Sequence, residues 1–313
     1  MDAVVRAVEA LFDHVAAIHW QFVALAALAH LSKMLARSRA WRNILAAAHP
    51  GTSVRWRTVL GAYAAGVGVN ALIPARGGDV LKLFLVKRGI PDAAYPTLVA
   101  TLLVETLFDL VISSALFIWA LTLGVLPGLD ALRFLPQIDW LWLFQHPRAG
   151  LVVSIAALIG GFAAGFWASA RIRAFRTRVS SGFAILRRPR AYTTGVLPWQ
   201  LLDWTLRLAT IYLLLRAFGV PATAHNALLV QLTQSLSTVL PLTPAGIGTE
   251  QVLLAYLFAG IAPAADVLSF SVGMKLTIIA VNVAAGATAL LIMLRTLRWR
   301  RSLDQAAGSR ASV

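Results

Sequence analysis

Long apolar runs constrain this chain more than any other feature of its sequence. They cover residues 14–32, 93–123, 149–170, 195–218 and 266–294, and Glu105 and Asp109 interrupt the second. A helix of about 20 apolar residues spans the hydrocarbon core of a bilayer, which is roughly 30 Å thick. Only 13% of the residues are charged, which is about half the usual share in a globular protein. We therefore predict an all-α polytopic membrane protein with about five full transmembrane helices.

The net charge of +15 is arranged in blocks between the apolar runs. Basic residues dominate 33–57, 171–190 and the stretch after residue 294, whereas 219–265 has no Lys or Arg. Such asymmetry is typical of the positive-inside rule and does not indicate nucleic-acid binding. We expect a cell inner membrane protein with its N-terminus outside and its C-terminus cytoplasmic. The block 171–190 is expected to lie on the anionic phospholipid surface.

Other chemistries find little support in the composition. The chain has no cysteine, which excludes disulfides and zinc–thiolate sites. Its 6 histidines show no metal-ligand spacing. We therefore expect no metal and no cofactor, and an oligomer is compatible with the sequence.

Two apolar segments, about 58–90 and 226–263, must begin and end on one side of the membrane in this topology. The first carries Lys82, Lys87 and Arg88, which assigns it to the cytoplasmic side, and the second has no basic residue. We predict that each is a re-entrant helical hairpin. Because lipid cannot hydrogen-bond an interrupted backbone, each tip must face protein or a watery cavity.

The two hairpins resemble each other in sequence. NALIPARGGDVLKLFLVKRGIPDAA (70–94) and TVLPLTPAGIGTEQVLLAYLFAGIAPAA (238–265) share the order proline, glycine, acid, apolar arm and a second proline. An odd number of crossings separates them, so we predict an inverted-topology repeat, in which such interrupted segments mark a substrate site. The alternative is a pair of unrelated kinks in ordinary spans. The residues expected to shape the tips are Asn70, Pro74, Gly77, Gly78, Pro241, Pro244, Gly246 and Gly248.

Charged residues inside apolar spans are costly, so each is treated as a functional candidate. Glu105 and Asp109 lie four residues apart on one helical face, which suits a proton relay or a cationic headgroup, or else a structural acceptor pair. Asp203 and Arg207 have the same spacing. They neutralise each other, or Arg207 is free to bind a lipid phosphate. Lys275 is expected to pair with Glu105 or Asp109, or to hold phosphate.

The hairpin breaks supply three further candidates, Arg76, Asp79 and Glu250. Helix N-termini exposed at a break suit a phosphate. The alternative for both acids is N-capping of the second arm.

Three motifs together carry a resemblance to a known family. They are NALIPARGGD (70–79), Val104-Glu105 followed by Asp109, and PLTPAGIGTE (241–250). The chain resembles the lysylphosphatidylglycerol synthase transmembrane family, the flippase-like domains that also occur as stand-alone membrane proteins, over roughly residues 10–295. The family usually has Arg after the Glu, where this chain has Thr106, and we expect Arg207 or Lys275 to replace that charge. It also usually has Gly where this chain has Ala245.

The resemblance implies a membrane lipid substrate moved between leaflets. We expect one transmembrane domain (1–301) and a disordered cytoplasmic tail (302–313), with no aminoacyltransferase domain, and hence no enzyme activity of that kind. Two alternatives remain at this point. One is an integral-membrane enzyme that uses Glu105 and Asp109 as acid and base, and the other is a scaffold for a soluble lipid-modifying enzyme.

Overall fold

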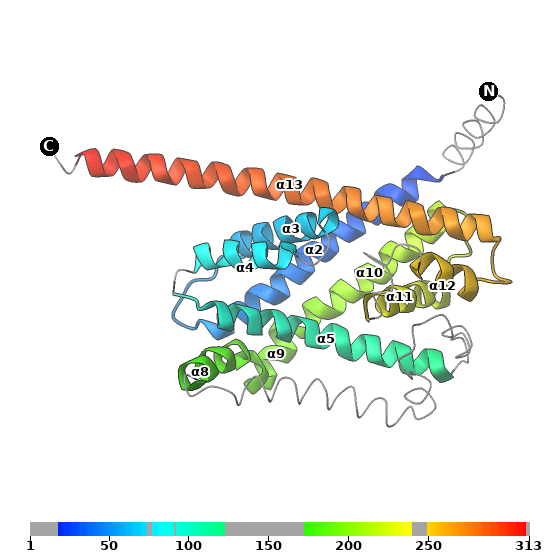
Figure 1. The fold of residues 1–313 in the computed structure, drawn as a ribbon, viewed down its shortest axis with the longest axis horizontal. Coiled ribbons are helices and arrows are strands. Elements are labelled where there is room, and N and C mark those ends of the chain that lie inside the picture. The colour runs from blue at the N-terminus through cyan, green and yellow to red at the C-terminus, as the bar shows by residue number, and fades with distance from the viewer. Residues whose placement is uncertain (1–17, 74–76, 91, 123–171, 240–248, 311–313) are drawn as a thin grey trace, which may run out of the picture.

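The computed structural model describes residues 18–73, 77–90, 92–122, 172–239 and 249–310, and over these ranges it is all helical, as predicted (Figure 1). The helices are α2 (Trp20–Ala48), α3 (Trp56–Leu72), α4 (Gly77–Gly89), α5 (Tyr95–Thr122), α8 (Ile172–Gly182), the short 3₁₀ helix η2 (Ala184–Arg187), α9 (Pro189–Gly195), α10 (Leu197–Ala217), α11 (Ala224–Val239), α12 (Thr249–Leu257) and α13 (Ala264–Arg310).

Helices α2 and α10 form a central antiparallel pair. At one end the backbone N–H of His19 donates to the carbonyl of Ala217 at 3.0 Å, and at the other the amide of Asn43 donates to the carbonyl of Gly195. Ala26 and Ala40 on α2 are fully buried. The pair therefore runs the length of the bundle and fixes which turns of the two helices face each other.

The first helix differs from the sequence prediction. We expected a span at 14–32 and a basic loop at 33–57, but α2 is continuous from Trp20 to Ala48. No Gly or Pro occurs until Pro50-Gly51, and Ala, Leu, Lys and Arg all favour a helix. The consequence is that several residues assigned to a cytoplasmic loop lie inside the bundle.

A pair of short helices occupies each predicted hairpin segment. Helices α3 and α4 have 17 and 13 residues, and α11 and α12 have 16 and 9. At about 1.5 Å per residue, none of them has the roughly 20 residues needed to span a bilayer alone. Their connections, and with them Pro74, Arg76, Pro241, Pro244, Gly246 and Gly248, lie outside the described residues.

Within the described chain, two helical segments are long and apolar enough to cross a membrane, judged by length and composition. They are Tyr95–Trp119 in α5 and Ala264–Met293 in α13, which coincide with two predicted spans. A third prediction, 195–218, coincides with α10, while 149–170 lies outside the described residues. The number of five crossings therefore stays a prediction.

The C-terminal segment also differs from its prediction. We expected disorder from residue 302, but α13 continues to Arg310. The sequence from 302 to 310 has no proline, and extending an existing helix avoids the cost of nucleation.

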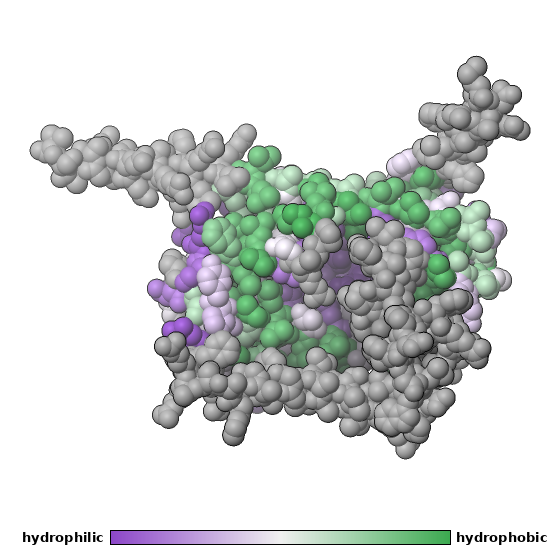
Figure 2. All heavy atoms as spheres, in the orientation of Figure 1, coloured by the Kyte–Doolittle hydropathy of each residue, from purple (hydrophilic) through white to green (hydrophobic). Residues whose placement is uncertain are grey.

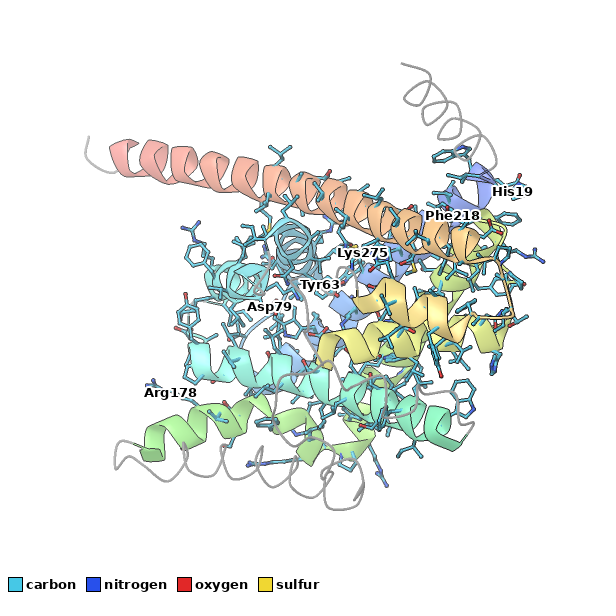
Figure 3. The ribbon with its side chains drawn as sticks, turned by 45° about the vertical axis from the view of Figure 1, so that its right-hand side comes forward. His19, Tyr63, Asp79, Arg178, Phe218 and Lys275 are labelled. Carbon is cyan, nitrogen blue, oxygen red and sulfur yellow. The ribbon has the colours of Figure 1, made fainter. Side chains whose placement is uncertain are left out.

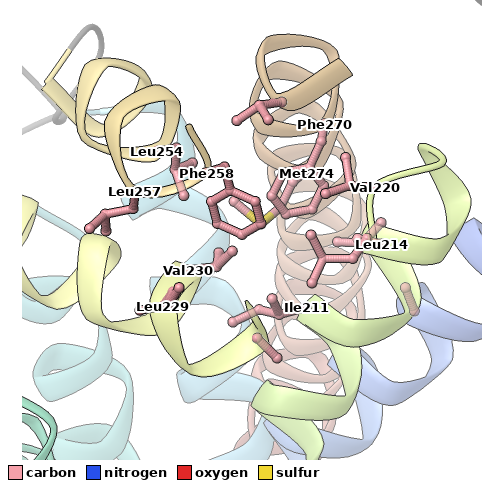
Figure 4. Packing of buried hydrophobic residues seen from close by; sticks show 14 residues of the cluster. Ile211, Leu214, Val220, Leu229, Val230, Leu254, Leu257, Phe258, Phe270 and Met274 are labelled. Atoms are coloured by element: carbon pink, nitrogen blue, oxygen red, sulfur yellow. The ribbon is translucent and has the colours of Figure 1, made fainter. Parts of the chain in front are cut away.

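Apolar packing holds the helices around these pairs. Ile211 and Leu214 of α10, Leu229 of α11, Phe258 after α12 and Phe270 of α13 belong to one buried cluster (Figure 4). A second cluster joins α3 and α4 to α2. Helices α3 and α13 approach closely, because a Cβ on Gly286 would lie only 2.7 Å from the Cα of Gly68.

Candidate functional site

The guanidinium of Arg37, on α2, contacts three carboxylates from two other helices. Its Nε donates to Glu105 Oε1 of α5 at 2.6 Å. Its Nη1 donates to Asp109 Oδ1 and to Asp203 Oδ2 of α10, each at 3.1 Å, and its Nη2 donates to Asp109 Oδ2. Arg37 therefore ties α2, α5 and α10 together through its planar, multi-donor head.

A second arginine stands beside this group. Arg207, on α10, lies 3.4 Å from Asp203 Oδ2 and 3.9 Å from Asp109 Oδ1. Its guanidinium also stands 4.7 Å from the ring centroid of Trp204, whose indole N–H donates to Asp109 Oδ1 at 2.9 Å. Arg207 thus makes longer ion pairs than Arg37 and is supported by an aromatic face.

Burial makes the pairing necessary. Glu105 is 5% exposed and Asp203 is 1% exposed. An unpaired charge at such depth would be very unfavourable. Lys33, one turn from Arg37 on α2, is within electrostatic range of Arg207, Asp203 and Asp109. The cluster of Lys33, Arg37, Glu105, Asp109, Asp203 and Arg207, called the charged cluster below, therefore holds as many acids as bases.

The first hairpin is closed by a side chain from its first arm. Asn70 Oδ1 accepts from the backbone N–H of Gly78 at 2.7 Å, and Asn70 Nδ2 donates to Asp79 Oδ1 at 3.2 Å. Asp79 also pairs with Lys82 at 3.0 Å. Asn70 thus satisfies an otherwise unpaired donor of the first turn of α4, while the expected N-cap, Asp79, instead binds two side chains.

The tip of this hairpin is connected to the charged cluster. Lys82 Nζ lies 4.7 Å from the ring centroid of Tyr63 on α3, and Tyr63 is within electrostatic range of Arg37 and Glu105. Tyr63 is buried, whereas the Asp79 side chain is 34% exposed (both labelled in Figure 3). The first hairpin therefore brings its own ion pair next to the cluster on α2, α5 and α10.

The second hairpin carries a comparable pair. Glu250, in the first turn of α12 and 7% exposed, accepts from Lys275 Nζ of α13 at 3.1 Å. We expected Lys275 to pair with Glu105 or Asp109, or to hold phosphate; the structure pairs it with Glu250, while Arg37 binds Glu105 and Asp109. Each hairpin thus places an acid in the first turn of its second arm; Asp79 pairs with a lysine of its own helix and Glu250 with a lysine of α13.

Thr106 stands where the family usually has an arginine, and the cation that takes the place of that arginine is not one of the two we expected. Thr106 is exposed, and its hydroxyl donates to the carbonyl of Leu102. We expected Arg207 or Lys275 to supply the cation, but Arg37 is the closest cation to both Glu105 and Asp109. The sequence prediction missed it because 33–57 was assigned to a loop.

The sequence contains a pattern that indicates a helical position for Arg37. Lys33 and Arg37 are four residues apart in a stretch without Gly or Pro, which places them on one face of a continuous helix. Tyr63 and Trp204 carried no comparable pattern.

Polar residues gather within a surface that is otherwise apolar. In the face drawn in Figure 2, hydrophilic residues lie in a central recess bordered by apolar surface. Across the described ranges no group of three or more His, Asp or Glu residues is arranged to hold a metal ion. The described site is a set of charges held in ion pairs.

Comparison with known proteins identifies the family of the chain. The family model described as the lysylphosphatidylglycerol synthase TM region matches residues 3–286. No curated protein and no solved structure matches the chain.

Proposed function

The chain belongs to the lysylphosphatidylglycerol synthase transmembrane family, a membrane-embedded family with a lipid-related function, and from this premise we propose that it is a flippase. In this proposal it moves a lipid with a polar or phosphate-containing headgroup between the leaflets of the inner membrane. The observation that carries the proposal is the charged cluster, buried among helices whose outer surface is apolar.

The physical problem of such transport is the headgroup. Moving a charged or polar group through hydrocarbon without partners costs many kcal/mol. A path lined by Arg37, Arg207 and their carboxylates provides hydrogen-bond partners along the way, while the acyl chains stay in lipid. Ion pairs can exchange partners one at a time, so a passing headgroup need not be left without a partner.

The hairpins define the ends of this path in our proposal. Helices α3–α4 and α11–α12 are re-entrant from opposite faces and form an inverted repeat, as in transporters built from interrupted helices. The acids of their ion pairs, Asp79 and Glu250, both lie in the first turn of the second arm. The N-terminus is outside, and the arginines of α8 and α9 face anionic headgroups at the cytoplasmic surface.

An acid–base role for Glu105 and Asp109 has weaker support. Both carboxylates bind Arg37, and Asp109 also accepts from Trp204, so both are already engaged in strong polar contacts. We therefore propose transport over lipid-modifying catalysis. A scaffold role would place function in the basic block 171–190 and would not need the buried cluster.

Reconstituted vesicles test the proposal. A fluorescent phospholipid is placed in both leaflets, and its exposure to a membrane-impermeant quencher is followed over time. Wild-type protein should increase the quenched fraction above the half that lies in the outer leaflet, and Arg37→Gln should reduce that rate. Arg216→Gln, an exposed arginine on α10, is the control. Lipid movement equal to that of protein-free vesicles, across phosphate-bearing and neutral lipids, would contradict the proposal.

A further inference from the structure

The antiparallel pairing of α2 and α10 places two cations in one layer of the bundle. Arg37 faces Asp203 across this pair at 3.1 Å. Lys33 lies one turn nearer the N-terminus of α2 than Arg37, and Arg207 lies one turn nearer the C-terminus of α10 than Asp203. Because the helices are antiparallel, both steps go in the same direction, by about 5.4 Å per turn.

The charges in neighbouring layers are therefore unevenly distributed. Arg37 binds all three carboxylates, and Arg207 shares two of them, Asp203 and Asp109, at longer distances. The next layer holds Lys33 and Arg207, which repel each other electrostatically. The whole charged cluster is neutral, but it has a positive end, and that end is formed by two side chains from facing helices.

Both cations have unused donors. Among the residues that the structure describes, Lys33 has no carboxylate within the 4.0 Å of an ion pair, and its ammonium carries three donors. The Nε of Arg207 is buried and has no hydrogen-bond partner in the same part of the chain. Its ion pairs, at 3.4 and 3.9 Å, are long compared with those of Arg37.

From this geometry we propose that Lys33 and Arg207 form a binding site for the phosphate of a lipid headgroup. The inference rests on the proposed function and assigns its substrate class, a phosphate-bearing lipid. An arginine fork beside a lysine point charge is suited to a phosphate. The face of Trp204 keeps the Arg207 guanidinium in place.

The neutrality of the empty cluster has a consequence for transport. The cluster needs no ligand for its charges to be balanced. A bound phosphate adds negative charge next to Asp203 and Asp109, which limits its affinity and allows release. A carrier requires this combination of recognition and exchange.

Lipid binding, measured separately from transport, tests the site. Purified protein in detergent is titrated with phosphatidylglycerol and with a phosphate-free glucosyl diacylglycerol, and bound lipid is counted by native mass spectrometry. Lys33→Gln and Arg207→Gln should each weaken phosphatidylglycerol binding by about tenfold, the range expected for a lost charge-assisted hydrogen bond. Binding of the glycolipid should not change.

Further variants keep the result interpretable. Arg207→Lys retains the charge without the fork, and should bind phosphatidylglycerol more tightly than Arg207→Gln does. Arg216→Gln, on the same helix, should bind like wild type. Unchanged phosphatidylglycerol binding in Lys33→Gln and Arg207→Gln overturns the site, even if vesicles show transport. Normal binding without transport overturns the proposed function and leaves the site intact.

A separate arm distinguishes a lipid phosphate from free phosphate. Inorganic phosphate at millimolar concentration should displace little phosphatidylglycerol, because the lipid is also held by its acyl chains. Full displacement by inorganic phosphate would show that the site takes the free ion, and would overturn the lipid assignment.

Discussion

Arg37 Nε lies 2.6 Å from Glu105 Oε1, although the two residues are 68 positions apart in the sequence. One comes from a stretch that reads as a basic loop, and the other from an apolar span. Their contact joins α2 to α5, and the same guanidinium reaches Asp203 on α10. Removing this one side chain would leave three carboxylates without their main cation.

Arg37→Gln should therefore destabilise the protein strongly. Breaking a buried ion pair by removing one partner costs about 3–5 kcal/mol in free energy of unfolding. The expected result is a large fall in Tm in detergent. Arg39→Gln, which removes a guanidinium 5.3 Å from the Trp56 ring centroid, should cost only about 0.5–1 kcal/mol. Equal falls in Tm for the two variants would contradict the assignment of Arg37.

The adjacent glycines at the first hairpin should respond differently to alanine. A Cβ on Gly78 would collide with the carbonyl oxygen of Gly66 and lie 2.7 Å from Asn70 Oδ1, whereas among the described residues a Cβ on Gly77 would meet Ile73 alone, at 3.9 Å. Gly78→Ala should lower stability by about 1–3 kcal/mol, as overpacking does. Gly77→Ala is the matched control and should be close to neutral. Thermal unfolding of both variants in one detergent compares them directly.

Asn70 can be tested as the side chain that closes this hairpin. Asn70→Ala removes the acceptor for Gly78 N–H and should cost about 0.5–2 kcal/mol, as loss of a helix cap does. Asn70→Asp keeps the acceptor but places a carboxylate beside Asp79. We expect it to be destabilising, and adding Asp79→Asn should restore part of the lost stability. Hydrogen exchange of the first turn of α4 reports the change locally. No change in that exchange for Asn70→Ala would contradict the capping role.

The pair Glu250–Lys275 is suited to a double-mutant cycle, because the two side chains approach at 3.1 Å from different helices. Glu250→Gln and Lys275→Gln should each lower Tm. The double variant should be less destabilised than the sum of the two, with a coupling of about 0.5–3 kcal/mol for residues in contact. Strict additivity would show that each residue acts through other partners.

Local patterns in the sequence determined much of this architecture. Apolar runs long enough to span a bilayer predicted helices, and the Gly- and Pro-containing segments predicted the positions of the two helix pairs. Glu105, Asp109, Asp203 and Arg207 were identified as candidates because a charge in an apolar run is costly wherever the run packs. The structure brings these four together. The three family motifs contain the same Gly- and Pro-containing segments and the same pair, Glu105 and Asp109.

Partners across the chain were decided by the tertiary structure alone. The sequence could not show that Arg37 holds Glu105, that Lys275 belongs to Glu250, or that Asn70 closes onto Gly78. Each contact depends on which turns of two helices face each other. That register is fixed by packing, as where small residues let α3 and α13 approach. Periodicity predicts the face of a helix on which a residue lies. Which residue of another helix lies opposite it depends on how all the helices pack together.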